Sequence, residues 1–471
     1  MSGLRLVALW VVLFAVYASG LGVEAFGGSD YGSDEPRYLL IAESIVSDGD
    51  LDLDDEYATS AYADWFPREF ETNARPTGAV LHEPQGAGFP LFIAPAYALG
   101  GPRLAELLVA AIAALGFVLA ALLARRIVPE PYASGGAALA GLSPPAVVYG
   151  TAVVPETLAG TLLAGAALCA VVARERPRVA GVIGGAAMLA ALPWLGIKYA
   201  VPALPVAIAL ARWPARGGRR LLGILSAELI VGSLVFYATL NERLFGGPTP
   251  YSAGLPGRTP FGTDSAVDYV ERAPRLIGLW IDRGYGVLRW APVLLLAFFA
   301  GWLLWRSRRE HLARLLPERA TAEAAAALAL AICGGQLLVA AFAAPTMHGD
   351  WFPGRQLVAA LPAAGALCAW GLRHAPRTGA VLAAITLAAS AWLLIARESW
   401  FPPDTSAPWG PLDVVFPDFR TATAWAIVAS GLVLAGLAAL VWRELSRAAS
   451  GTPGRGSGFG RMSRAAPDRR R

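Results

Sequence analysis

Charged residues are scarce in this chain of 471 residues. They make up 16% of the sequence, whereas hydrophobic residues make up 56%. Soluble globular proteins average about 25% charged residues, so this composition excludes an ordinary soluble multidomain enzyme. We therefore expect a polytopic integral membrane protein whose principal solvent is the bilayer.

Cysteine is also rare. The three cysteines, Cys169, Cys333 and Cys368, all fall within apolar stretches. Such positions are typical of small buried side chains, and they argue against a disulfide framework or a thiolate metal site. We assign these cysteines no chemistry.

Long apolar stretches are what the sequence has in abundance. A membrane-spanning helix needs about 20 mostly apolar residues, and this criterion predicts an all-α fold of about 12 transmembrane helices. They are expected at residues 4–23, 104–124, 133–150, 156–173, 179–196, 198–211, 221–240, 288–305, 321–344, 356–372, 378–396 and 421–442. The first stretch could instead be a cleaved secretory signal. However, Arg5 is a single charge where a signal peptide has a positively charged region, and no convincing cleavage site follows.

The charges indicate an orientation. With the N-terminus inside, most basic residues fall in cytoplasmic loops and most acidic residues fall outside, as the positive-inside rule requires. We therefore expect a multi-pass plasma-membrane protein with both termini cytoplasmic and the chemistry outside. Residues 1–442 would form the transmembrane domain. The Gly, Ser and Arg-rich tail, 443–471, is expected to be disordered and to meet anionic lipid rather than nucleic acid.

The first outer segment, 24–103, is too long for a plain connection. Apolar residues recur in it at helical spacing from Pro36 to Val46, which predicts a short amphipathic helix lying on the membrane surface. A second outer loop, 241–287, is rich in Gly and Pro, and shorter outer loops are expected at 345–355 and 397–420.

Asp34 and Glu35 follow the first span closely and precede the predicted helix. Acids at a helix N-terminus are favoured by its dipole, so capping is one interpretation. The other is catalytic, because neighbouring carboxyls can shift the pKa of one another and one could remove a proton from a hydroxyl nucleophile. Glu156, at another outer helix start, is interpreted as a capping acid.

Lys198 is the only lysine in the chain, and it lies at the outer end of an apolar hairpin. Arg355 begins a predicted span from the outer side. Both could bind a phosphate, the ammonium as a point charge and the guanidinium bidentately. The alternatives are a lysine that extends to the membrane surface and an interfacial arginine.

Two outer histidines lie beside acids, in His82-Glu83 and His348-Gly349-Asp350. Such ligands would suit a divalent metal with an open position, but neither pair has a diagnostic spacing. Hydrogen bonding to a polar substrate or to neighbouring loops is the favoured interpretation. We assign no metal site and no certain cofactor, and a divalent metal stays open.

The acidic stretch from Asp48 to Glu56 resembles a calcium loop only superficially. Leu53 and Thr59 stand where an EF-hand loop needs its Gly and its final Glu. We interpret the stretch as a solvated acidic surface with Leu51 and Leu53 turned inward.

The joint order of these motifs resembles the GT-C superfamily of polyprenyl-phosphate-sugar-dependent glycosyltransferases, the aminoarabinose transferases and protein O-mannosyltransferases above all. The resemblance covers about residues 1–370. It rests on Asp34-Glu35-Pro36-Arg37-Tyr38, Asp48-Gly49-Asp50-Leu51, His82-Glu83-Pro84-Gln85-Gly86, Lys198-Tyr199 and Trp351 to Arg355. One departure is that His82-Glu83-Pro84 stands where aminoarabinose transferases carry a Lys-Pro-Pro-type element.

The resemblance implies an inverting transfer of a sugar from a polyprenyl phosphate to an envelope lipid, glycan or protein acceptor. It implies that Asp34 is the catalytic base with Glu35 as its partner, and that Lys198 and Arg355 bind the donor phosphate. The residues expected to contact substrate are Tyr38, His82, Glu83, Tyr199, His348 and Asp350.

Two other function classes remain open. Twelve spans also suit a secondary transporter or lipid flippase, but the only acid deep within a predicted span is Glu228, and transport does not explain the long acidic first segment. A noncatalytic envelope-assembly protein would require no individual outer carboxylate.

Overall fold

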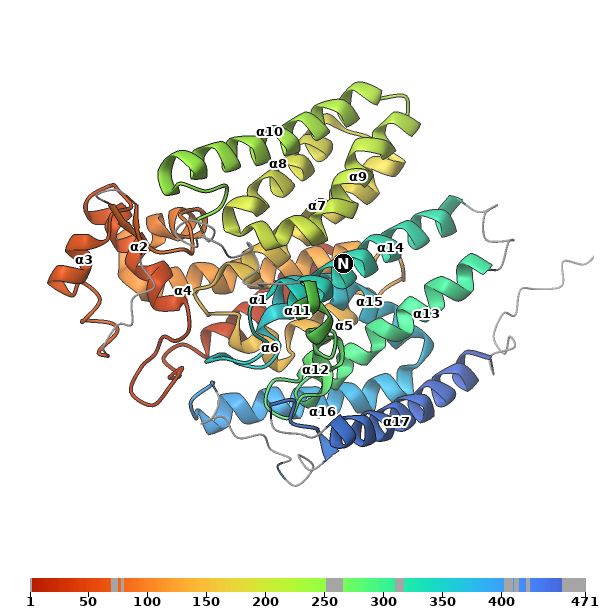
Figure 1. Ribbon diagram of the computed structural model, residues 1–471. Coiled ribbons are helices and arrows are strands. Elements are labelled where there is room, and N and C mark those ends of the chain that lie inside the picture. The colour runs from red at the N-terminus through yellow and green to blue at the C-terminus, as the bar shows by residue number, and fades with distance from the viewer. Residues whose placement is uncertain are drawn as a thin grey trace, which may run out of the picture.

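The computed structural model describes residues 2–68, 75–77, 80–250, 266–309, 317–401, 410, 415–420 and 424–450. Helices make up most of this part of the chain (Figure 1). In chain order the elements are α1 (Ser2–Ala18), α2 (Glu35–Ser47), α3 (Asp54–Thr59), β1 (Arg75–Thr77), β2 (Val80–His82), α4 (Gly88–Ala124), α5 (Tyr132–Gly141), α6 (Pro144–Val148), α7 (Pro155–Glu175), α8 (Val179–Leu195), η1 (Ile197–Tyr199), α9 (Ala200–Arg216), α10 (Arg220–Phe245), α11 (Ala266–Glu271), α12 (Arg275–Ile281), η2 (Val287–Arg289), η3 (Pro292–Leu294), α13 (Leu295–Arg309), α14 (Pro317–Leu338), η5 (Val339–Ala343), η6 (Arg355–Ala360), α15 (Leu361–His374), α16 (Pro376–Ala396) and α17 (Ala424–Ser450).

Six helices of the described chain are long and apolar enough to cross a membrane. They are Gly88–Ala124, Pro155–Glu175, Arg220–Phe245, Ala320–Ala343, Arg355–His374 and Pro376–Ala396. This result supports a helical polytopic membrane protein. Shorter apolar helices such as α1 and α8 fall below that length, so the expected total of about twelve spans stays a prediction.

Two predicted boundaries are wrong. A third stays a prediction: α4 begins at Gly88, within the expected first outer segment 24–103, and is interrupted by non-helical backbone at Gly100 and Gly101, just before the span expected from residue 104. The stretch 133–150 is not one helix, because Pro144 starts a separate α6 after α5 ends at Gly141. The stretch 288–305 becomes α-helical only at Leu295, after the two 3-10 turns η2 and η3.

Two further expectations concern the outer helix and the tail. A helix covers the predicted 36–46 segment, but α2 packs closely against α4 and buries Leu39, Leu40 and Ile41; its position on a membrane surface stays a prediction. At the other end, α17 continues to Ser450, and the predicted disorder of 443–471 stays a prediction. Residues 451–471, and 251–265 of the second outer loop, lie outside the described residues.

Small residues let the central helices approach closely. A Cβ added to Gly136 of α5 would lie 2.3 Å from the backbone nitrogen of Ala369 in α15, so only glycine fits there. One continuous core joins α1, α4, α5, α7 and α15. Figure 1 shows α8, α9 and α10 packed as a layer on one side of these helices, with α2 and α3 at one end of the molecule.

Candidate active site

Asp34 and Arg355 form the centre of the candidate site. The Arg355 Nη2 atom lies 2.5 Å from Oδ2 of Asp34, although 321 residues separate them in sequence. The Arg355 side chain is only 5% exposed, whereas that of Asp34 is 33% exposed. The carboxylate therefore stays partly accessible to solvent, while the guanidinium beside it is buried.

The backbone on both sides of this pair is unusual. Gly354 has φ +90, and a Cβ there would crowd Val287 and Pro145, so glycine is needed where the chain turns into η6. Ser33 has φ 56, a conformation that non-glycine residues rarely adopt, and its hydroxyl accepts a hydrogen bond from Arg355 Nη1. Strain of this kind is typical of positions held for function.

Glu156 joins the second predicted cation to the same cluster. Its Oε1 atom accepts a hydrogen bond from Lys198 Nζ at 2.9 Å and lies 3.6 Å from Arg355 Nε. The Glu156 side chain is 2% exposed, and that of Lys198 is 35% exposed. Asp34, Arg355, Glu156 and Lys198 thus form one chain of alternating charges, which we call the charge chain. The interpretation of Glu156 as only a capping acid is wrong.

We expect Glu156→Gln to lower the free energy of unfolding by about 3 kcal/mol, because it leaves Arg355 and Lys198 without their shared buried anion. Denaturant unfolding in detergent micelles measures the change. The matched control is Glu175→Gln at the other end of α7, where the partner is Arg126 and both side chains are about one-third exposed; such pairs contribute at most about 1 kcal/mol. Equal losses in the two variants would contradict a buried charge chain.

The ionisation of Asp34 follows from these contacts. Burial would raise the pKa of its carboxyl, but the adjacent Arg355 guanidinium, together with Arg37 and Lys198, outweighs burial and holds that pKa below its ordinary value. Gln85 also donates to Oδ1 at 3.4 Å. Asp34 is therefore a carboxylate at neutral pH, as a base must be.

Glu35 is directed at the protein backbone. Its Oε1 accepts a hydrogen bond from the Val153 amide at 2.8 Å, and its Oε2 accepts one from the Gly32 amide at 3.0 Å. The side chain also borders a small cavity of about 20 Å³ that Asp30 and Glu106 share. Both carboxylate oxygens anchor the start of α2, so this geometry supports a positioning role for Glu35.

Burial raises the pKa of Glu35 from 4.5 to about 7, against the two backbone hydrogen bonds that lower it. Because the folded state holds this proton more tightly, the contribution of Glu35 to stability is complete below pH 4.5 and is lost as the pH rises through about 7. We expect the free energy of unfolding of the wild type, relative to Glu35→Gln, to fall by about 3 kcal/mol across that window. Parallel denaturant titrations measure it, and a difference independent of pH would contradict it.

Tyr38 and Tyr199 border the charge chain. Tyr38 is buried and packs edge-on against Phe89; burial raises the pKa of its phenol, and the carboxylates of Asp34 and Glu156 raise it further. The Tyr199 hydroxyl is buried and makes no hydrogen bond within the described chain, while Lys198 Nζ lies 5.1 Å from the centre of its ring. Buried hydroxyls usually have a partner, so Tyr199 has a donor to offer a ligand.

Glu83 connects to the site through Arg37. Its Oε2 lies 3.5 Å from Arg37 Nε, and Arg37 in turn lies 3.8 Å from Asp34. Its Oε1 accepts a hydrogen bond from the Tyr57 hydroxyl at 2.5 Å. His82 is 2% exposed and its ring packs against Phe245 at 4.5 Å.

The two histidine pairs do not combine into a metal site within the described chain. His348 Nε2 lies 3.5 Å from Asp282, not beside Asp350, which is exposed. Asp282 also accepts hydrogen bonds from the amides of Tyr285 and Phe419. Burial would raise the pKa of Asp282, but these bonds and His348 lower it overall. The structure gives His348 a contact with Asp282, which fixes the neighbouring loops.

Sequence reasoning missed several members of the site. Glu156 is interpreted from the sequence as a capping acid, and the sequence indicates no separate role for Ser33, Arg37 or Gln85. The one local signal was Lys198, because a solitary lysine in an apolar hairpin requires an anion, and Glu156 supplies it.

No protein-family model matches the chain, and no curated protein sequence matches it. Solved structures do match. ArnT from Cupriavidus metallidurans bound to undecaprenyl phosphate superposes with a TM-score of 0.51 at 17% identity, covering 94% of this chain and 73% of that chain. The chain has an ArnT-like fold. The apo structure of the same protein gives a TM-score of 0.49 at 18% identity, with 95% and 74% covered.

The match to ArnT agrees, in fold, with the resemblance that the motifs indicated. At this level of identity the likeness concerns the fold, and function must be argued from the site. The resemblance implies roles for Asp34, Lys198 and Arg355, and all three lie in the charge chain.

Proposed function

We propose that this protein is a membrane glycosyltransferase that moves a sugar from a polyprenyl-phosphate donor to an envelope lipid, glycan or protein acceptor on the extracytoplasmic face. The observation that carries the proposal is the charge chain, in which the one-third exposed Asp34 carboxylate pairs with Arg355, and Glu156 links Arg355 to Lys198, a second cation suited to a phosphate. The ArnT-like fold supports it, since the matching ArnT structure is bound to undecaprenyl phosphate.

Asp34 is the base in this proposal. The acceptor hydroxyl gives its proton to the Asp34 carboxylate while its oxygen attacks the anomeric carbon of the sugar. The bond from that carbon to the phosphate oxygen breaks, and its electron pair leaves with the polyprenyl phosphate. Attack opposite the leaving group inverts the anomeric configuration. The polyprenyl phosphate gains one negative charge in this step.

Arg355 and Lys198 stabilise that growing charge. Both are held in position before the donor arrives, and fixed donors of this kind stabilise a transition state without reorganisation. The donor phosphate must share Arg355 with Asp34, which lies 2.5 Å from it. Sharing weakens the ion pair between the guanidinium and Asp34, so donor binding makes the carboxylate a stronger base before the transfer step.

Donor binding can be tested separately from transfer. We expect undecaprenyl phosphate to raise the unfolding temperature of the purified protein in detergent, because a ligand that binds only the folded state stabilises it. Lys198→Ala should weaken this binding by roughly 10-fold, the effect of one charge-assisted hydrogen bond at a partly exposed site. The matched control is Arg178→Ala. Arg178 is an exposed cation just before the start of α8, and Lys198 lies shortly after the end of that helix.

Two results would contradict the donor assignment. One is an unfolding temperature that undecaprenyl phosphate leaves unchanged. The other is equal binding by Lys198→Ala and wild type. A decrease shared with Arg178→Ala would show attraction of the phosphate to general positive charge rather than to the charge chain.

A further inference from the structure

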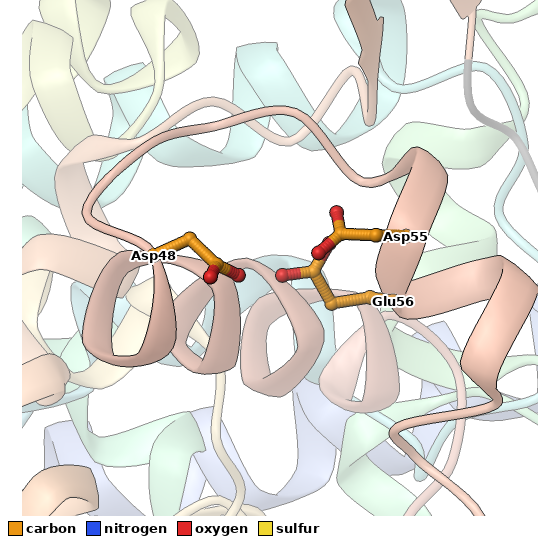
Figure 2. A group of neighbouring side chains, drawn as sticks. All are labelled: Asp48, Asp55 and Glu56. Atoms are coloured by element: carbon orange, nitrogen blue, oxygen red, sulfur yellow. The ribbon is translucent and has the colours of Figure 1, made fainter.

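A second group of carboxylates lies outside the charge chain, where α2 ends and α3 begins. One carboxylate oxygen each from Asp48, Asp55 and Glu56 lie within 4.8 Å of one another. Figure 2 shows the Asp48 side chain reaching from the end of α2 toward those of Asp55 and Glu56 on α3. We call this group the α2–α3 acidic cluster.

Glu56 is the residue that distinguishes the cluster from a solvated surface. It is 3% exposed, and neither of its carboxylate oxygens has a hydrogen-bond partner within the described chain. Asp48 and Asp55 are exposed, as a solvated acidic stretch would be, but Glu56 is aimed into the cluster beside them. A buried carboxylate without a partner is costly unless a proton or a cation compensates its charge.

The surroundings favour a cation. Among the described residues, every basic side chain in an ion pair contacts an acid other than Asp48, Asp55 and Glu56. Asp48 caps the C-terminus of α2, and the free carbonyl end of a helix carries partial negative charge. Three carboxylates and a helix C-terminus thus concentrate negative charge on one point.

We propose that Asp48, Asp55 and Glu56 bind one divalent cation of the calcium type. Carboxylate oxygens are the ligands of hard cations, and Ca²⁺ accepts six to eight oxygens in flexible geometry. Water can complete the shell from the exposed side of Asp48 and Asp55. The site uses residues from two helices rather than one loop, which is why it lacks an EF-hand pattern.

The cation would fix α3 against α2, and α3 carries Tyr57. The Tyr57 hydroxyl donates to Glu83. Backbone contacts support the same connection, because the Leu53 amide donates to the Leu81 carbonyl at 2.9 Å and the Leu81 amide donates to Asp52 at 2.8 Å. A cation at the cluster therefore orders the segment that holds Glu83, without touching Asp34.

A carboxylate that binds a cation must be ionised, so a bound cation displaces any proton held by the cluster. If the cluster instead holds only a proton, calcium will not compete for it near neutral pH.

Calorimetric titration of the chelator-treated full chain in detergent tests the site. We expect one Ca²⁺ to bind per chain and at least a 10-fold weaker affinity in Glu56→Gln and Asp55→Asn. Asp54→Asn removes the same charge from the same helix at an exposed residue outside the cluster, and it should bind like the wild type. Calcium should also raise the unfolding temperature of the wild type but not that of Glu56→Gln.

The proposal is overturned if the wild type binds no Ca²⁺, or if Glu56→Gln and Asp55→Asn bind it as the wild type does. Loss of binding equally in Asp54→Asn would also overturn it, because it would reveal diffuse attraction. Should Glu56→Gln fail to fold, the exposed positions Asp48→Asn and Asp55→Asn decide the question. Because binding is measured without sugar transfer, the result is independent of the proposed function.

Discussion

Asp34→Asn is expected to lower the rate of sugar transfer by roughly 10³-fold, within the range that a positioned general base contributes. The asparagine keeps the shape of the side chain and can still accept a hydrogen bond from Arg355, but it cannot take the proton of the acceptor hydroxyl. Undecaprenyl phosphate binding should be retained or strengthened, because Arg355 loses its competing carboxylate. The rate is measured with purified protein, a polyprenyl-phosphate sugar and envelope acceptors.

The control for Asp34→Asn is Asp64→Asn, which removes an exposed acid from the same outer segment. It should transfer sugar as the wild type does. Transfer at the wild-type rate by Asp34→Asn would exclude Asp34 as the base. A variant that neither transfers sugar nor binds undecaprenyl phosphate would indicate that Asp34 only maintains the site, which also contradicts its role as base.

Arg355→Lys is expected to lower kcat/KM for the donor by at least 10²-fold. Arg355 donates to Ser33 and Asp34 through separate nitrogens, and its Nε lies 3.6 Å from Glu156. A lysine retains the charge but presents one compact ammonium, which cannot replace the planar fork of the guanidinium. Stabilisation of the leaving phosphate therefore weakens although the net charge is unchanged.

The matched control is Arg373→Lys, an exposed arginine in the last turn of α15, the helix that follows η6. We expect it to have wild-type kinetics, so that any loss in Arg355→Lys reports the geometry of the site rather than the exchange of arginine for lysine. Arg355→Lys with an unchanged kcat/KM would show that charge alone suffices there, and it would contradict the bidentate role.

The sequence predicted where most helices lie because apolar length alone decides which segments enter a bilayer. It failed at Pro144, which begins a separate short helix inside the stretch expected to be one span, 133–150. Proline is a helix breaker, but apolar length alone does not show that the helix ends there.

The candidate site was predictable only in part. Asp34, Lys198 and Arg355 each carried a local signal, namely an acid beside a helix start or a cation in an apolar setting. The pairing of Lys198 with Glu156 spans 42 residues and that of Arg355 with Asp34 spans 321, and no periodicity encodes such contacts. The cluster of Asp48 with Glu56 was missed for a different reason, because the side chain of Glu56 turns inward from a stretch of otherwise exposed acids.

The proposed transfer of a sugar is tested most directly in liposomes that contain the wild-type protein together with envelope lipids, glycans and proteins. The donor is a polyprenyl-phosphate sugar that carries a label in its sugar, and the fate of the label is followed. We predict that the label moves to an envelope acceptor with inverted anomeric configuration, while polyprenyl phosphate is released in equal amount. Persistence of the intact donor with every acceptor class, under conditions where the protein binds undecaprenyl phosphate, would contradict the assignment as a glycosyltransferase.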